Sequence, residues 1–169
     1  MDSMVIKMKN VKIILVLIAS LVIFTTGCDS QDYDIKRETN EQCSELLDCL
    51  SKNDPDGIKE LFCTAVSNSK NFDDDVLKAV AYFDGEVSSY DIKSIGSDEK
   101  SENGKVVTIH ISPKLWDVET STGKNYKISY YAYLVNSDNP EYIGISEILF
   151  KCSDGTEFKL GNYSLANPQ

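Results

Sequence analysis

The fold is decided within residues 79–94, which read AVAYFDGEVSSYDIKS. Before Phe83, apolar residues recur every three or four positions, as they do along one face of an α-helix. After Gly85 the apolar spacing becomes two, which is typical of β-strands, and the glycine at this switch favours a turn. The sequence therefore predicts helices before this stretch and strands after it.

Three helical stripes precede the switch. The first predicted helix covers residues 38–52, and the second begins after Asp54, a good N-cap, with Pro55 at its first position. The third follows the acidic triplet 73–75. The stripes consist of Cys43, Leu46, Leu47 and Leu50; Ile58, Leu61, Phe62 and Ala65; and Val76, Leu77, Val80 and Ala81.

The triplet 73–75 has two interpretations, a calcium site or the start of a helix. It lacks the alternating oxygen ligands, the turn glycine and the distal glutamate of a calcium-binding loop. An N-cap together with favourable negative charge at a helix start explains it better, so no metal site is predicted.

Five strands are predicted after the switch, separated by turns rich in Gly, Asn and Asp. They cover residues 87–95, 106–113, 126–135, 142–152 and 156–160. Helices followed by a run of adjacent strands indicate an α+β fold in which N-terminal helices pack on an antiparallel sheet of four to five strands. On the fourth strand, alternation puts Ile145 on the same face as Leu149.

The N-terminus carries an export signal. Three lysines within residues 7–12 precede a 12-residue apolar run, 13–24, which is too short for a spanning helix and fits a secretory signal peptide. The segment that follows this run and ends in Gly27-Cys28 resembles a bacterial lipoprotein signal, although Thr25 departs from the usual Leu. The resemblance implies cleavage before Cys28 and lipid attachment to its thiol. An ordinary signal peptide, or a signal anchor with an incidental cysteine, is the alternative.

Net charge narrows the choice of partners. The chain has 169 residues and a net charge of −10, which counts against nucleic acid as a partner because the phosphates would repel it. Residues 1–27 hold three Lys and one Asp, so 14 basic and 26 acidic side chains remain after cleavage, a net charge of −12. We therefore expect the domain to meet the lipid bilayer only through the acyl chains on Cys28, at the extracytoplasmic face of the cell membrane.

The expected organisation has four parts. Residues 1–27 form the signal peptide, 28–37 the lipidated cysteine and a polar linker, 38–161 a single domain, and 162–169 a C-terminal tail.

The order of elements, the helical hairpin 46–62 and the segment Phe83-Asp84-Gly85 leading into Ser89-Tyr90-Asp91 resemble the cystatin-like fold of nuclear transport factor 2 and its relatives. The resemblance covers about residues 38–160. It implies helices packed on a strongly curved sheet, together enclosing a cone-shaped pocket. With the export signal, the chain is similar to a family of uncharacterised exported lipoproteins of low-GC Gram-positive bacteria, which implies a fold and a location but no reaction.

Four cysteines remain in the mature chain. Cys43 and Cys49 lie on different faces of one predicted helix, so they cannot pair while that helix is intact. A disulfide between Cys49 and Cys63 across the helical hairpin is conceivable. The alternative is that the cysteines are small buried apolar residues, which the apolar stripe favours for Cys43.

The candidate pocket residues are Trp116, which follows a predicted strand, and four aromatic or titratable strand residues, Tyr130, His110, Asp91 and Glu147. Enzymes that have the fold that this chain resembles use an Asp, His or Tyr in the pocket as acid or base. No catalytic motif surrounds the candidate residues of this chain. We therefore assign no catalytic role and no cofactor.

Two functional hypotheses follow. The first is a non-catalytic module that binds a small ligand, a protein or, through its sheet, a second copy of itself. The second is a small acid–base enzyme of the isomerase or hydrolase type. A deep pocket with a buried carboxylate beside His110 or a tyrosine hydroxyl would favour the enzyme, whereas a filled cone would favour the binding module.

Overall fold

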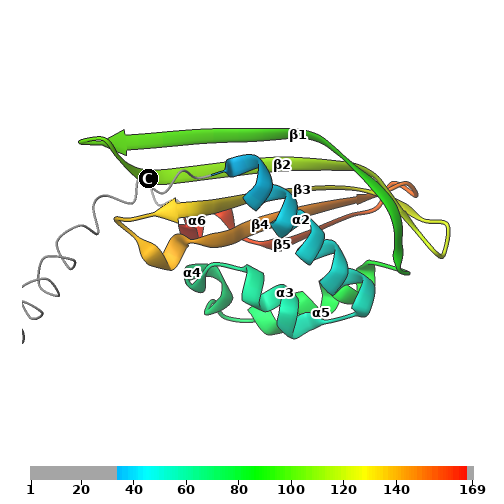
Figure 1. The fold of residues 1–169 in the computed structure, drawn as a ribbon. Coiled ribbons are helices and arrows are strands. Elements are labelled where there is room, and N and C mark those ends of the chain that lie inside the picture. The colour runs from blue at the N-terminus through cyan, green and yellow to red at the C-terminus, as the bar shows by residue number, and fades with distance from the viewer. Residues whose placement is uncertain (1–33, 167–169) are drawn as a thin grey trace, which may run out of the picture. The chain divides into compact units, whose positions relative to one another are not determined.

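A computed structural model describes residues 34–166, and Figure 1 shows how helices precede strands along the chain. Gly27 and Cys28 lie outside the described residues. The helices are α2 (Ile35–Lys52), α3 (Pro55–Leu61), α4 (Thr64–Ser67), α5 (Phe72–Tyr82) and α6 (Tyr163–Ala166), with a 3₁₀ turn, η2 (Pro140–Tyr142). The strands are β1 (Val87–Glu102), β2 (Lys105–Thr120), β3 (Asn125–Asn136), β4 (Gly144–Cys152) and β5 (Glu157–Gly161).

The strands form one antiparallel sheet in the order β1-β2-β3-β4-β5. Helices α2, α3 and α5 cover one of its faces, and among residues 34–166 no long helix lies on the other face (Figure 1). The register shifts at several points between β1, β2, β3 and β4, and such bulges bend and twist a sheet. The predicted α+β fold with a curved antiparallel sheet is thus confirmed.

The turn between α5 and β1 is fixed by contacts with Tyr126 of β3. The hydroxyl of Tyr126 accepts a hydrogen bond from the backbone N–H of Asp84 at 3.0 Å and donates one to the carbonyl of Tyr82 at 3.2 Å. Its ring stacks on that of Phe83, with centroids 4.7 Å apart. Gly85 then adopts a φ of 92°, a conformation that side chains other than glycine's rarely allow.

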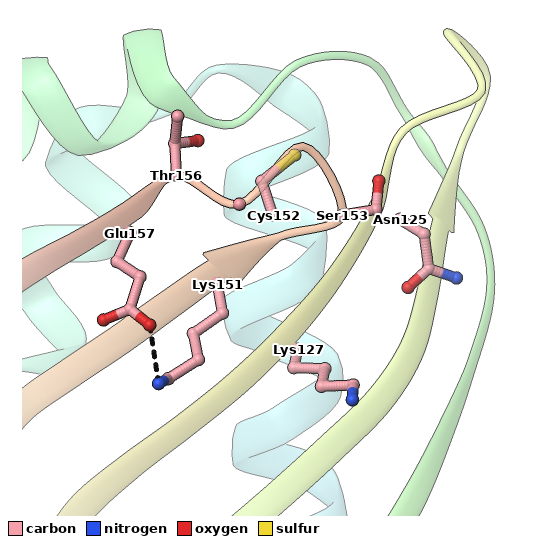
Figure 2. A pocket seen from close by; sticks show the side chains of 8 residues that line it. Asn125, Lys127, Lys151, Cys152, Ser153, Thr156 and Glu157 are labelled. Atoms are coloured by element: carbon pink, nitrogen blue, oxygen red, sulfur yellow. Dashed lines mark ion pairs between the residues drawn. The ribbon is translucent and has the colours of Figure 1, made fainter.

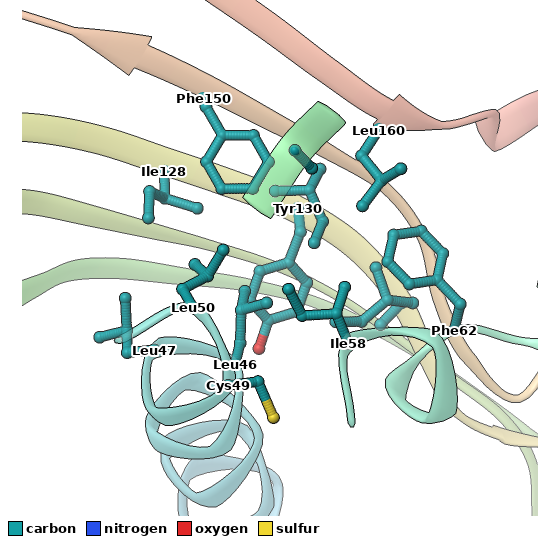
Figure 3. Close-up of a cluster of buried hydrophobic side chains, with 14 of the residues drawn as sticks. Leu46, Leu47, Cys49, Leu50, Ile58, Phe62, Ile128, Tyr130, Phe150 and Leu160 are labelled. Atoms are coloured by element: carbon teal, nitrogen blue, oxygen red, sulfur yellow. The ribbon is translucent and has the colours of Figure 1, made fainter. Parts of the chain in front are cut away.

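The core lies between the helices and the inner face of the sheet. Figure 3 shows Tyr130 reaching from the sheet toward α2, among leucines of that helix and Ile58 of α3. The other large side chains that are fully buried in this core are Tyr126, Phe150, Leu46, Ile109, Ile111, Leu115, Ile128, Ile145, Ile148 and Leu160. The space that would be a cone-shaped pocket is therefore filled by the protein's own side chains.

Two helices differ from the sequence prediction. The first starts at Ile35, earlier than the predicted residue 38, because the carboxylate of Asp34 caps it by accepting from the N–H of Arg37. The second has its predicted N-cap, Asp54, but ends at Leu61. The helix ends there because the backbone N–H of Cys63 donates a hydrogen bond to the carbonyl of Ile145 at 2.9 Å, which connects this segment to β4.

The third helix begins at Phe72, so the triplet 73–75 lies in its first turn, where negative charge stabilises the helix dipole. The N-cap is Asn71, and its side chain makes no capping hydrogen bond. The prediction that the triplet contributes charge is confirmed, but the prediction that it supplies the cap is wrong.

Strands β1 and β2 continue well beyond their predicted ends, so Trp116 lies inside β2. On β4, the prediction from alternation that Ile145 shares a face with Leu149 is wrong. Ala132 is paired with Ile145 and Tyr131 with Glu147, which leaves Ser146 as an extra residue. This bulge turns Ile145 to the core side together with Ile148.

The four cysteines of the described domain are free and buried, and the Cys49–Cys63 disulfide is not formed. Burial raises the pKa of the Cys43 and Cys63 thiols, which keeps both neutral. Within residues 34–166, no helix is both long and apolar enough to cross a membrane.

Candidate functional site

The sheet separates the five candidate pocket residues. Tyr130 lies on the inner face and is 1% exposed. Trp116, His110, Asp91 and Glu147 lie on the opposite, outer face. There Asp91 is paired with Trp116, and Glu147 is paired with the exposed Tyr131. The structure therefore brings four of the five to one surface but puts Tyr130 in the core.

Tyr130 is a structural residue. Its hydroxyl lies 3.3 Å from the sulfur of Cys43 on α2, and this contact is buried. Burial raises the pKa of Tyr130 far above its ordinary value, so its hydroxyl stays protonated at any physiological pH. A proton that cannot leave and a side chain that no ligand can reach make Tyr130 unsuited to acid–base chemistry.

His110 belongs to an aromatic cluster on the outer face. Its ring stacks on Tyr131 with centroids 5.9 Å apart, and Tyr133 and Tyr163 meet it edge-on at 5.1 and 5.9 Å. Its Nε2 is buried and has no hydrogen-bond partner within the part of the chain that the structure describes. Burial lowers the pKa of His110, an effect that the negative charge of Asp98 partly opposes.

The two candidate carboxylates, Glu147 and Asp91, interact with groups other than His110. Glu147 accepts from the backbone N–H of Tyr163 at 3.2 Å and pairs with Lys159 at 3.4 Å. Asp91 pairs with Lys93 at 3.0 Å. Among the described residues no hydrogen bond joins His110 to a carboxylate, and no three metal-ligating side chains gather into a metal site.

The low pKa of His110 predicts a pH-dependent stability. An unfolded histidine titrates near 6.5, so the unfolded chain takes up this proton at a higher pH than the folded chain does. Stability is therefore retained above about pH 6.5 and is lost as the pH falls below it. Urea unfolding at pH 7.5 and 5.5 should show a larger loss for the wild type than for His110→Gln, because the carboxylates titrate alike in both. Equal losses would contradict the burial of His110 as a neutral ring.

A second group of side chains lies on the outer face beside Trp116, and sequence reasoning missed it. Lys127 of β3 holds its Nζ 4.7 Å from the centroid of the Trp116 ring. Lys127 is paired directly with Lys151 of β4, which in turn is paired with Glu157 of β5. Figure 2 shows Lys127 and Lys151 side by side on the face of the sheet away from the helices.

These side chains line two hollows. The larger, about 360 Å³, is formed by the ends of β3, β4 and β5 and includes Lys127, Lys151 and Glu157. The smaller, about 130 Å³, lies between Lys114, Trp116 and Ser129 and shares Lys127 and Lys151 with the first. We call the two together the lysine groove. No periodicity in the sequence could reveal it, because it depends on which residues the register places opposite each other.

Comparison with known protein families adds one finding. A family model described as "Domain of unknown function (DUF5104)" matches residues 45–154. The match includes Tyr130 of the core and the lysine groove up to β4. No curated protein matches the chain.

Proposed function

Since the chain belongs to the DUF5104 family, whose function is unknown, we propose a function from its geometry. The domain is a non-catalytic interaction module that binds its partner through the outer face of the sheet. We call this face the working surface. The observation that carries this proposal is the filled interior, where Tyr130 and its neighbours occupy the space between helices and sheet.

The outer face offers what a binding surface needs. It carries Trp116 and Tyr131, which are 40% and 42% exposed, and aromatic residues of this kind are enriched in protein interfaces. The lysine groove lies beside Trp116 on the same face. The alternative, an acid–base enzyme, has less support because the two candidate groups do not form an acid–base pair. His110 stacks on Tyr131, whereas Glu147 pairs with Lys159.

The proposal includes a location. The lipoprotein-like signal ending in Gly27-Cys28 supports a domain held by acyl chains on Cys28 at the extracytoplasmic face of a Gram-positive cell membrane. The order of helices followed by five antiparallel strands supports a kinship with the domain of nuclear transport factor 2. In this chain the cone of that fold serves as a scaffold, and the partner is a protein, a small ligand or a second copy of the domain.

Photo-cross-linking tests the proposal. A benzoylphenylalanine at position 131 probes the outer face, and the same residue at position 77 probes the helix side, where Leu77 is 57% exposed beside another surface hollow. In the cells that make the protein, we expect adducts from position 131 and none from position 77. The mass of the adduct separates a second copy of the chain from another partner.

A further inference from the structure

The lysine groove breaks a rule of sheet construction. Like charges directly opposite each other on neighbouring strands destabilise a sheet, yet Lys127 and Lys151 form such a pair on the outer face. The Nζ of Lys151 is 2.6 Å from a carboxylate oxygen of Glu157, whereas Lys127 has only the ring of Trp116. Glu157 therefore neutralises Lys151, but no carboxylate among residues 34–166 pairs with Lys127, and a local conflict of this kind is expected at functional positions.

Lys114 adds a third cation. It lies next to Trp116 in the smaller hollow, and its strand partners are Ser94 on β1 and Ser129 on β3, both neutral residues. Within residues 34–166, neither Lys114 nor Lys127 makes an ion pair. The groove therefore holds two uncompensated positive charges in a chain whose net charge is −10.

We propose that the lysine groove binds an acidic peptide segment of a partner protein, with carboxylate side chains meeting Lys114 and Lys127 beside Trp116. The proposal rests on the outer face being the working surface, and it names the chemistry of the partner. Charge complementarity supports a peptide with about two carboxylates, since two lysines lack a counter-ion. The pair of Lys151 with Glu157 already shows a carboxylate bound in this groove.

The net charge does not prevent this contact. At physiological ionic strength the Debye length is about 8 Å, so charges on the far side of the domain are largely screened from a ligand in the groove. A phosphate group carries nearly two negative charges, so Glu157 in the groove would repel it more strongly than it repels a carboxylate, which carries one. The groove therefore favours a carboxylate over a phosphate.

The test uses a peptide of ten glutamates, with a peptide of ten glutamines as its uncharged counterpart. Both are titrated into the full-length protein in neutral detergent at physiological salt. Binding is followed by anisotropy of a label on the peptide and by the emission of Trp116, the single tryptophan of the chain. The glutamate peptide should bind and change the Trp116 emission, and the glutamine peptide should do neither.

Lys114→Met is the decisive variant, because it removes a charge without leaving a carboxylate unpaired. It should weaken binding about three- to fivefold, the range that an exposed ion pair supports. Lys36→Met, an exposed lysine on α2, is the matched control and should leave binding unchanged. Failure of the glutamate peptide to bind, equal effects of the two variants, or tighter binding of inorganic polyphosphate would each overturn the proposal. Adducts from position 131 would in that case still support the outer face as the working surface.

Discussion

Replacing Tyr130 with alanine should lower the free energy of unfolding by about 3–5 kcal/mol, the range found when a large buried aromatic side chain is truncated. Tyr130 is 1% exposed and fills the space between α2 and the sheet. The substitution leaves a cavity there, and it also removes the partner of the Cys43 thiol, 3.3 Å from the hydroxyl. Urea unfolding, followed by far-UV circular dichroism, measures the loss.

Tyr131→Ala is the matched control, since the next residue along β3 points to the outer face and is 42% exposed. Its truncation should cost less than about 1 kcal/mol, because little apolar area leaves the core. If Tyr130→Ala also costs less than about 1 kcal/mol, the interior is not the packed scaffold described above and a ligand cavity there becomes tenable.

The second large effect concerns Cys28. In protein extracted from membranes, mass spectrometry should find an N-terminal peptide that starts at Cys28 and carries two or more acyl chains. Two chains give a stable anchor, whereas a single chain binds a bilayer only marginally. Cys28→Ala should abolish the lipid-bearing peptide completely.

Ser30→Ala, two residues further on, tests whether the effect is specific to the thiol and should leave the acylated peptide intact. A mature chain that carries an unmodified Cys28 would contradict the anchor. That result would leave the outer face as a binding surface untouched, because the two proposals rest on different residues.

Much of the fold could be predicted from local patterns. The stripe containing Cys43 and Leu50 and the cap at Asp54 each depend on residues a few positions apart, so they are visible in the sequence. The change of period around Gly85 is also local, and the structure puts the turn there.

Features that depend on distant residues could not be predicted in this way. The second helix stops at Leu61 because Cys63 bonds to Ile145, which is far along the chain. The bulge at Ser146 is set by the pairing with β3, and it reverses the face of Ile145. Alternation alone has no means of locating such an extra residue.

The candidate site shows the same division. Sequence reasoning identified Trp116 and His110 as residues of interest, but it placed Tyr130 with them because all three are aromatic or titratable residues on or next to predicted strands. The assembled sheet shows that Tyr130 faces the helices while the other two face outward. The pairing of Lys127 with Lys151 likewise appears only once the register is known.

The cross-linking comparison of positions 131 and 77 tests most directly whether the outer face of the sheet is the working surface. The predicted result is an adduct from position 131, next to His110 and Tyr163, and no adduct from position 77 on α5. An adduct from position 77 with none from position 131 would contradict the proposed function and move the working surface to the helices.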